Sequence, residues 1–348
     1  MTTLPLMIDV HCHTRDFNQK HKGTFETETK AALAGGFGTV LTMPNTDPSI
    51  TSRSRLVKAR HKADGRIYCD LGFHFGTNGY NMSEFAGVKD LVYGLKIYLN
   101  PTTGNLELKD PRYVERVFAT WTVDKPILVH AEGANLVEKV LALAEKHKRR
   151  LHICHISLKE EVRLIHNAKR NGIKVTAEVC PHHCIFTEDD LPRLGSYGLM
   201  KPPLGTIKDV EAVWSGIKGQ VIDIVATDHA PHSPEEKASE RPPFGVIGEP
   251  AFSVMWMQFS QRGFQIEDLV RLMHETPALM FGIQTDEQSY MEVDLDDEFE
   301  FKREMIQSKA GRSPYEGMRV RGRIRRIVLH GKEVMHDGEI LARNGRVI

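Results

Sequence analysis

Two histidines stand two residues apart near the start of the chain, in the stretch DVHCHTRD that spans residues 9–16. This stretch directly follows the apolar run LPLMI, so it continues a strand that is expected to be buried. Because side chains alternate between the two faces of a strand, His11 and His13 point to the same side and can reach one metal ion. Arg15 lies on that side too and suits an anion. The alternative is a strand end that frays into solvent, since a His-x-His pair is short enough to arise by chance.

The same kinds of side chain end several other short apolar runs. They are Asn45 in MPNT, Lys96 in GLKIYLN, His130 in PILVHAE, His155 in HICHIS, Glu178 in VTAEVCPHH and Asp228 in IVATDHAPH. A single strand histidine is usually an ordinary core or surface residue, but a repeated pattern of this kind indicates one shared site. Neutral imidazoles and carboxylates are good zinc ligands. We therefore expect one ion at His11, His13 and Asp228, and a second ion at His130 and His155.

Lys96 is the unusual member of this group. A strand lysine most often lays its stem along apolar surface and keeps its ammonium in water. A desolvated lysine can also form a Schiff base, as in barrel aldolases. Two zinc ions would repel an ammonium, however. Carbon dioxide can convert the neutral amine into a carbamate, an anion with one oxygen for each ion, so we expect Lys96 to be carboxylated.

These residues need a scaffold that brings the ends of strands together. Short apolar runs rich in β-branched residues alternate regularly with longer amphipathic stretches, which favours a parallel sheet. The predicted strands cover residues 6–13, 39–43, 68–75, 93–99, 127–130, 151–155, 174–179 and 222–227, and the predicted helices include residues 26–34, 111–121, 136–147, 159–171, 207–217 and 266–281. Eight such strands predict an α/β fold, the (β/α)8 TIM barrel, whose reactive residues lie at the carboxyl ends of the strands.

The character of the sequence changes near residue 290. The stretches MEVDLDDEFEF and VRGRIRRIVLHGKEVMHDGEI show strand-like alternation and an HDG turn. We therefore expect two domains, a barrel over residues 1–285 and a small β-rich appendage over residues 286–348. The one long loop expected is the segment 231–248, which is rich in Pro, Glu and Lys.

The composition excludes several classes of partner. Lys and Arg total 46, as do Asp and Glu, so the formal net charge is zero. Nucleic acids and anionic membranes select for a basic excess, so neither is expected as a partner. No apolar run reaches the ~20 residues of a membrane span, and no signal peptide is recognisable. The five cysteines are odd in number and scattered, which predicts reduced thiols and a cytoplasmic protein.

In their order and spacing, DVHCHTRD, MPNTDPSI, GLKIYLN, VHAE, HICHIS, AEVCPHH and ATDHAPH resemble the dihydroorotases of the amidohydrolase superfamily. The similarity is greatest to the dihydroorotase domain of the eukaryotic multifunctional pyrimidine-synthesis enzyme, and it extends to SPYEGMRVRGRIRRIVLHGK near the C-terminus. The resemblance implies two zinc ions bridged by carboxylated Lys96 and held by His11, His13, His130, His155 and Asp228. Cys154 and Glu178 correspond to residues of an additional, third zinc site in that relative.

The resemblance also implies the reaction. Dihydroorotases interconvert N-carbamoyl-L-aspartate and (S)-dihydroorotate in pyrimidine (UMP) biosynthesis, and a guanidinium can bind the carboxylate of either molecule in a bidentate manner. The implied substrate contacts are Arg15, Asn45, Lys201, His232 and Phe244, with Thr102 and Thr103 in the active-site loop. Asp228 is the implied catalytic base and acid. The family further implies a homodimer and association with aspartate transcarbamoylase.

Two alternatives remain open. One is another cyclic amidase, a hydantoinase or allantoinase, which shares much of the metal set but lacks an arginine at the position of Arg15. The other is a non-catalytic dihydroorotase-like scaffold for aspartate transcarbamoylase. Such scaffolds typically lose metal ligands, whereas this sequence keeps every ligand named above.

Overall fold

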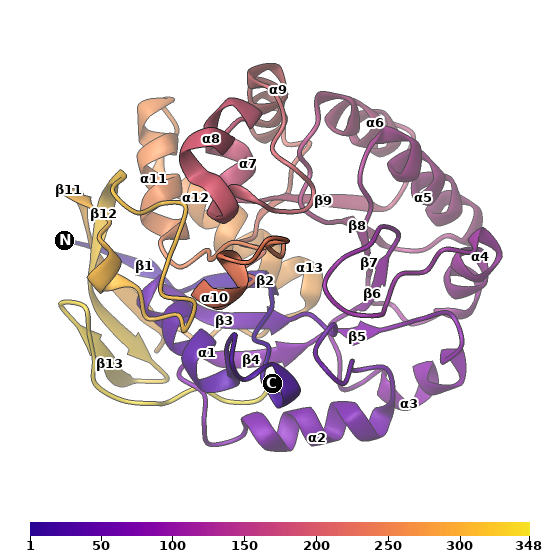
Figure 1. Ribbon diagram of the computed structural model, residues 1–348, viewed down its shortest axis with the longest axis horizontal. Coiled ribbons are helices and arrows are strands. Elements are labelled where there is room, and N and C mark those ends of the chain that lie inside the picture. Colours follow the sequence, from indigo (N-terminus) through magenta and orange to yellow (C-terminus); the bar gives the residue numbers. More distant parts are fainter.

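Eight strand positions run parallel around a closed barrel (Figure 1). The computed structural model describes all 348 residues. The barrel strands are β2 (Met7–Cys12), β3 (Phe37–Thr42), β4 (Asp70–Phe73), β5 (Phe75–Gly76), β6 (Leu95–Tyr98), β7 (Ile127–His130), β8 (Leu151–Ile153), β9 (Val175–Val179) and β10 (Ile224–Val225). Only His74 separates β4 from β5, and its backbone N–H donates to Thr42 of β3 at 3.0 Å, so the two form one interrupted strand. The barrel closes where Cys12 pairs with His229 beyond β10.

Helices surround the barrel, and most of them cover the outer faces of its strands (Figure 1). They are α1 (Phe25–Ala34), α2 (Arg53–Ala63), α3 (Phe85–Val88), α4 (Pro111–Thr120), α5 (Ala134–His147), α6 (Lys159–Arg170), α7 (Pro181–Ile185), α8 (Leu191–Leu194), α9 (Ile207–Lys218), α10 (Pro234–Lys237), α11 (Ala251–Gln261), α12 (Ile266–Val270) and α13 (Thr276–Phe281). Strands β6, β7 and β8 are buried along their whole length. Burial on both faces explains why they appear in the sequence as continuous apolar runs.

The predicted (β/α)8 barrel is confirmed, with differences at the ends of elements. Strand β10 covers only Ile224–Val225 and is shorter than the predicted 222–227 at both ends. Beyond it, Asp228 takes a left-handed φ of 46°. The predicted helix 266–281 is interrupted by a π-helical turn at Arg271–Glu275. The predicted loop 231–248 contains the short helix α10.

A second, antiparallel sheet lies against one side of the barrel (Figure 1). Its strands, in order across the sheet, are β1 (Thr2–Pro5), β11 (Tyr290–Glu300), β12 (Arg319–Leu329), β13 (Lys332–His336) and β14 (Glu339–Ile340). The HDG turn joins β13 to β14. The sequence pattern does not predict β1, which precedes the first barrel strand and pairs with β11, placing Thr2 opposite Val293. We therefore propose a division in which Thr2–Pro5 joins the appendage formed by residues 286–348.

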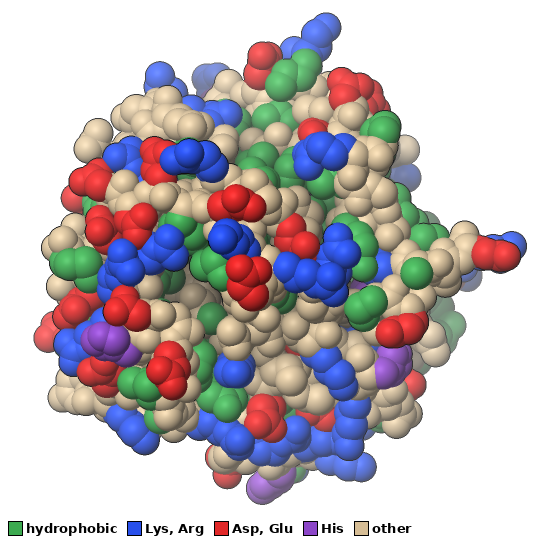
Figure 2. All heavy atoms as spheres, turned by 60° about the vertical axis from the view of Figure 1, so that its left-hand side comes forward, with side chains coloured by type: hydrophobic (Ala, Val, Ile, Leu, Met, Phe, Trp, Pro, Cys, Tyr) green, Lys and Arg blue, Asp and Glu red, His purple; other side chains and the backbone are tan.

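Apolar side chains fill the space between the barrel strands and the helices. Phe25 of α1 meets Phe73 of β4 edge to face, and Phe85 of α3 meets Trp121 in the same way, with ring centroids 6.0 and 5.2 Å apart. On the surface, positive and negative side chains are interspersed over the face that carries the appendage (Figure 2), in keeping with the zero net charge. No helix has the length and apolar character needed to cross a membrane.

Candidate active site

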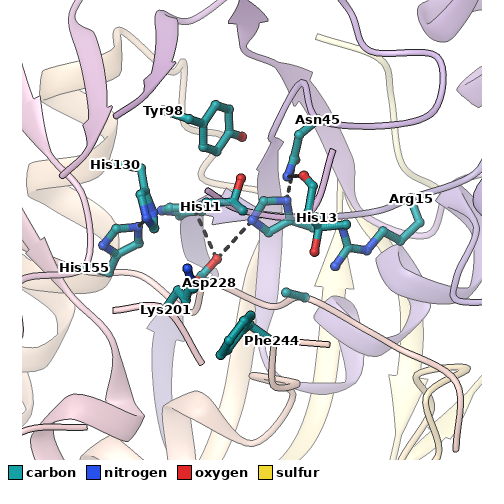
Figure 3. A pocket seen from close by; sticks show the side chains of 14 residues that line it. His11, His13, Arg15, Asn45, Tyr98, His130, His155, Lys201, Asp228 and Phe244 are labelled. Atoms are coloured by element: carbon teal, nitrogen blue, oxygen red, sulfur yellow. Dashed lines mark hydrogen bonds and ion pairs between the residues drawn. The ribbon is translucent and has the colours of Figure 1, made fainter. Parts of the chain in front are cut away.

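A polar pocket opens at the carboxyl ends of the barrel strands (Figure 3). Its volume, mouth included, is about 420 Å³. The predicted residues that line it are His11, His13, Arg15, Asn45, Thr102, Thr103, His130, His155, Lys201, Asp228 and Phe244. The other predicted residues lie buried behind this lining; they are Lys96, Cys154, Glu178 and His232. The structure thus brings the site residues that were predicted from the sequence to one end of the barrel.

His11, His13 and Asp228 form the centre of the pocket. Nε2 of His11 and Nε2 of His13 lie 3.2 and 3.0 Å from the same oxygen, Oδ1 of Asp228. Asn45 fixes the tautomer of His13: Nδ2 of Asn45 donates to the Thr103 carbonyl at 2.9 Å, so its Oδ1 accepts from Nδ1 of His13 at 2.7 Å. Nε2 of His13 is then a bare lone pair that faces a carboxylate oxygen. Two acceptors at this distance need a cation between them, so these residues fit a metal ion.

Burial and charge set the protonation of these central groups. Burial lowers the pKa of His13 to about 4, so its imidazole is neutral and able to bind a metal. Burial acts in the same direction on His11, but the buried carboxylate of Glu178 raises the pKa of His11 to about 10. Burial disfavours the charge of Asp228, yet the His11 cation holds the pKa of this carboxyl below its usual range. A bound metal ion would replace the proton on His11 and preserve this balance of charge.

His130 and His155 form a second nitrogen pair beside the first. Nδ1 of His130 lies 2.7 Å from Nε2 of His155, and Nδ1 of His155 is buried without a partner. Nε2 of His130 donates to Glu132 at 3.0 Å, which leaves Nδ1 as the lone pair. Burial lowers the pKa of both imidazoles. The pair therefore fits a second metal ion.

Lys96 lies in β6 behind the histidines and has no exposed surface. Its Nζ lies 2.9 Å from Sγ of Cys154 and forms no ion pair with a carboxylate. A fully buried ammonium without an anionic partner is costly. A carbamate on this nitrogen would instead place an anion beside groups that fit metal cations.

His11, Cys154 and Glu178 form another group with ligand atoms within 4.8 Å of one another. Nδ1 of His11 donates to Oε1 of Glu178 in a short hydrogen bond, and Nε2 of His152 donates to Oε2 at 2.9 Å. These are the residues that the family resemblance implies for an additional metal. In this structure Glu178 also orients His11 towards Asp228, since it fixes the proton on the far ring nitrogen.

Arg15 is a buried cation without an anionic partner. It is only 2% exposed, and it forms no ion pair. Its Nε donates to the Pro231 carbonyl at 3.2 Å, Nη2 lies 3.3 Å from Nε2 of His232, and Nη1 has no partner. Burial, together with the charge of Arg15, lowers the pKa of His232 to about 2, so this imidazole is neutral and accepts the hydrogen bond. In Figure 3 Arg15 lies beyond His13, at the opposite end of the site from His155.

Lys201 and Phe244 lie together at the rim of the pocket, on the side of Asp228 (Figure 3). Nζ of Lys201 sits 4.8 Å from the centre of the Phe244 ring and donates to the Pro101 carbonyl at 2.8 Å. Pro101 precedes Thr102 and Thr103, so Lys201 ties the rim to the loop after β6. Phe244 remains 45% exposed, which leaves it free to cover a ligand.

The backbone is strained at three residues of the site. Arg15, His155 and Asp228 have positive φ values of 61°, 40° and 46°. Such conformations cost about 1–3 kcal/mol for residues other than glycine, and they persist where the surrounding structure holds them. In each case the unusual turn at the end of a strand directs the side chain into or alongside the pocket.

Two residues near the site were not predicted from the sequence. Tyr98 lines the pocket, and its buried hydroxyl has no partner. It lies two residues after Lys96 in β6, so alternation along the strand was the signal that could have identified it. Glu132, which orients His130, follows it by two residues in the VHAE motif, and its carboxylate next to a candidate ligand was also a usable signal.

Comparisons with known proteins place the chain in a family. A model of the dihydro-orotase-like family matches residues 2–95. The chain is 39% identical, over 98% of its length, to the multifunctional protein CAD of Squalus acanthias, of which it spans only 15%. It is 34% identical to the dihydroorotase of Staphylococcus epidermidis, with 96% of the chain and 87% of that protein covered. The chain belongs to the dihydroorotase family.

Solved structures share the barrel of this dihydroorotase-family chain. The L-hydantoinase from Arthrobacter aurescens superposes with a TM-score of 0.94 at 24% identity, covering 99% of this chain and 88% of that one. The inactive dihydroorotase-like domain of the Chaetomium thermophilum CAD-like multifunctional protein superposes with a TM-score of 0.83 at 22% identity, covering 100% and 99%. Identities this low establish the fold, and the activity must be argued from the site.

Proposed function

We propose that the chain is a dihydroorotase that interconverts N-carbamoyl-L-aspartate and (S)-dihydroorotate. The observation that carries this proposal is Arg15, a buried guanidinium at one end of the pocket that forms no ion pair and has one nitrogen without any partner. A substrate with a carboxylate would supply the missing anion, and both proposed substrates have one. A hydantoin or allantoin ring lacks this carboxylate and would leave Arg15 unpaired, so the geometry disfavours those substrates.

The proposal includes two zinc ions and a carboxylated Lys96. One ion would be held by His11, His13 and Asp228, the other by His130 and His155, with the carbamate of Lys96 available to both. When bound, zinc polarises a carbonyl oxygen and lowers the pKa of water from 15.7 towards ~7. Cys154 and Glu178 supply residues for a third ion together with His11.

In this proposal, different residues of the chain bind the substrate and transfer the proton during hydrolysis. Arg15 binds the substrate carboxylate, and the neutral His232 supports the guanidinium from behind. This places the ring amide towards Asp228, which lies in the middle of the pocket (Figure 3). Asp228 accepts a proton from the attacking water and delivers it to the ring nitrogen as the C–N bond breaks. In the reverse direction Asp228 removes a proton from the ureido nitrogen, which attacks the side-chain carboxylate with loss of water.

The proposal extends to the setting of the enzyme. The chain corresponds to a segment of a multifunctional relative, CAD, and this supports an association with aspartate transcarbamoylase. The homodimer in the proposal rests on the family resemblance alone. All five cysteines are free and buried, which supports a cytoplasmic location. The rival proposal of a non-catalytic scaffold lacks support from the pocket, because all the implied zinc ligands are present and converge.

An ultraviolet assay of dihydroorotate hydrolysis, with metal analysis of the same sample, tests the proposed function. We expect turnover of dihydroorotate, little turnover of hydantoin or allantoin, and at least two zinc ions per chain. Asp228→Asn is the matched control for contaminating activity: it should lose turnover and keep much of its metal, since the histidines remain. If the metal-loaded protein cleaves hydantoin but not dihydroorotate, the proposed substrate is wrong. If it cleaves neither compound, the proposal that the chain is an enzyme of this kind is wrong.

A further inference from the structure

A third group of metal-ligating side chains lies outside the residues assigned above. Cys180 follows β9, and His182 and His183 lie in the short helix α7. Their ligand atoms lie within 4.8 Å of one another, and all three residues are buried. None of them lines the substrate pocket. This group, Cys180, His182 and His183, is called the β9–α7 cluster below.

The hydrogen bonding of His183 fixes which of its nitrogens is free. Its Nε2 donates to the carbonyl of Pro202 at 3.0 Å, because a carbonyl can only accept. Nδ1 is therefore a bare lone pair, and it is buried without a partner. Metal-binding histidines typically have this arrangement, in which one ring nitrogen donates to a carbonyl and the other faces the ion.

His182 is more unusual, because both of its ring nitrogens are buried without a partner. A buried polar group left without a hydrogen bond costs about 1–3 kcal/mol, and His182 carries two such groups. Cys180 is a free cysteine with no exposed surface. The cluster thus combines a thiol, two imidazoles and a set of unused lone pairs in one buried position.

We propose that the β9–α7 cluster binds a structural zinc ion through Cys180, His182 and His183. One sulfur and two imidazole nitrogens are a donor set that zinc accepts, with water completing a tetrahedral arrangement. Binding converts the Cys180 thiol to a thiolate and releases one proton. The ion gives the unused lone pairs of both histidines a partner, and through His183 it ties α7 to the segment at Pro202. The alternative occupant is an ordered water molecule.

Cobalt substitution distinguishes the two occupants. A thiolate bound to Co²⁺ gives a charge-transfer band in the near ultraviolet, whereas nitrogen and oxygen ligands do not. Cys154 could produce such a band from its own group, so the measurement begins with Cys154→Ser. We expect cobalt-loaded Cys154→Ser to retain a thiolate band. Absence of the band would overturn the proposal and leave water as the occupant.

A second substitution assigns the band to one cysteine. Adding Cys180→Ser to the Cys154→Ser protein should abolish the band and remove about one metal ion per chain. Adding Cys184→Ser instead is the matched control, since Cys184 lies in α7 and is also buried but is outside the cluster. This substitution should change neither the thiolate band nor the metal content. A band that survives Cys180→Ser would overturn the proposal. If that variant fails to fold, zinc X-ray absorption of the Cys154→Ser protein decides: a sulfur neighbour supports the site, and its absence refutes it.

Discussion

At the scale of single residues, the proposed function makes Arg15 the residue that selects the substrate. Arg15→Met should lower kcat/KM for dihydroorotate by about a hundredfold or more, because a charge-assisted contact contributes about 1.5–3 kcal/mol and its loss also leaves the substrate carboxylate unpaired. The zinc content should change little, since a guanidinium cannot ligate a cation. Steady-state kinetics with dihydroorotate and with dihydrouracil, which lacks the carboxylate, measure the effect. The substitution should reduce the difference in kcat/KM between dihydroorotate and dihydrouracil. Equal losses on both would make Arg15 a structural residue.

Lys96 should control metal content. Lys96→Ala removes the proposed carbamate, so we expect zinc content and activity to fall together, with partial recovery on adding short carboxylic acids. Lys125→Ala is a suitable control, because Lys125 donates only to backbone carbonyls outside the pocket. Metal analysis and the hydrolysis assay on both variants provide the measurement. Full zinc and full rate in Lys96→Ala would contradict the carbamate.

The sequence predicts the types of the site residues better than their hydrogen bonding. His11, His13 and Asp228 could be named because each ends a strand, and the ends of parallel strands meet. The role of Asn45 in fixing the tautomer of His13 depends on the Thr103 carbonyl, far away in the chain. The unused nitrogens of His182 are likewise a property of its surroundings. Neither could be derived from residue spacing.

At the scale of elements, the turn after β2 holds Arg15 in place. Three consecutive residues, Arg15, Asp16 and Phe17, have positive φ. The buried Asp16 carboxylate accepts from the backbone of Phe17 and of Phe25 at 2.7 and 3.2 Å and pairs with Lys62 at 2.8 Å. Burial disfavours its charge, but the hydrogen bond from Lys62 keeps the pKa of Asp16 below its usual range. The turn therefore depends on an ionised carboxylate.

Asp16→Asn should loosen this turn. The amide loses the ion pair and keeps at most one good acceptor, so we expect a loss of about 1–3 kcal/mol in stability and a raised KM for dihydroorotate, with the metal content unchanged. Because ionisation of Asp16 stabilises the fold, its contribution is present above pH ~3.9 and is lost as the pH falls through its lower folded pKa. Thermal unfolding and kinetics of Asp16→Asn and Lys62→Met, compared at neutral pH, test this. An unchanged KM in both variants would show that the turn does not position Arg15.

Strong periodicity decided which elements could be predicted. Helices α4, α5, α6 and α9 show clear amphipathic patterns and lie within a few residues of their predicted bounds. Helix α2 was not predicted, because it is strongly basic and buries only Leu56, Ala59 and Ala63, so its apolar face is weak in the sequence. Helix α11 was not predicted for the opposite reason. It is apolar on nearly all sides, so the sequence shows no alternation between an apolar face and a polar face.

At the scale of the whole molecule, both ends of the chain connect the two units. β1 pairs with β11 of the appendage and is followed almost at once by β2 of the barrel. At the other end Val347 pairs with Leu71 of β4, so the chain returns from the appendage to the barrel. The barrel and the β-rich appendage could be predicted from local patterns. These long-range pairings could not, because strands of two to four residues show no periodicity.

The two units also share a buried network of acids. Glu28 of α1 contacts His229 at 2.7 Å and accepts from Ser308 at 2.6 Å. Glu249 accepts from the backbone N–H groups of Gln307 and Ser308 at 2.6 and 3.1 Å. His229 is the residue that closes the barrel, and residues 307–308 belong to the appendage. The network therefore couples closure of the barrel to docking of the appendage.

Glu249 should make the stability of the whole molecule depend on pH. Burial, aided by the charge of Glu28, raises the pKa of Glu249 from 4.5 to about 8. The folded state therefore keeps a proton that the unfolded state has lost. Glu249 therefore stabilises the fold fully at a pH below its pKa in the unfolded state. As the pH rises above that value, its contribution falls by about 1.4 kcal/mol per pH unit, until the pH passes its pKa in the folded state. Glu249→Gln cannot ionise, so the difference in melting temperature between wild type and variant should shift in favour of the variant from pH 5 to pH 8.5. Comparing the two proteins at each pH cancels the shared effects of metal binding. A difference that stays constant across this range would show that Glu249 ionises normally.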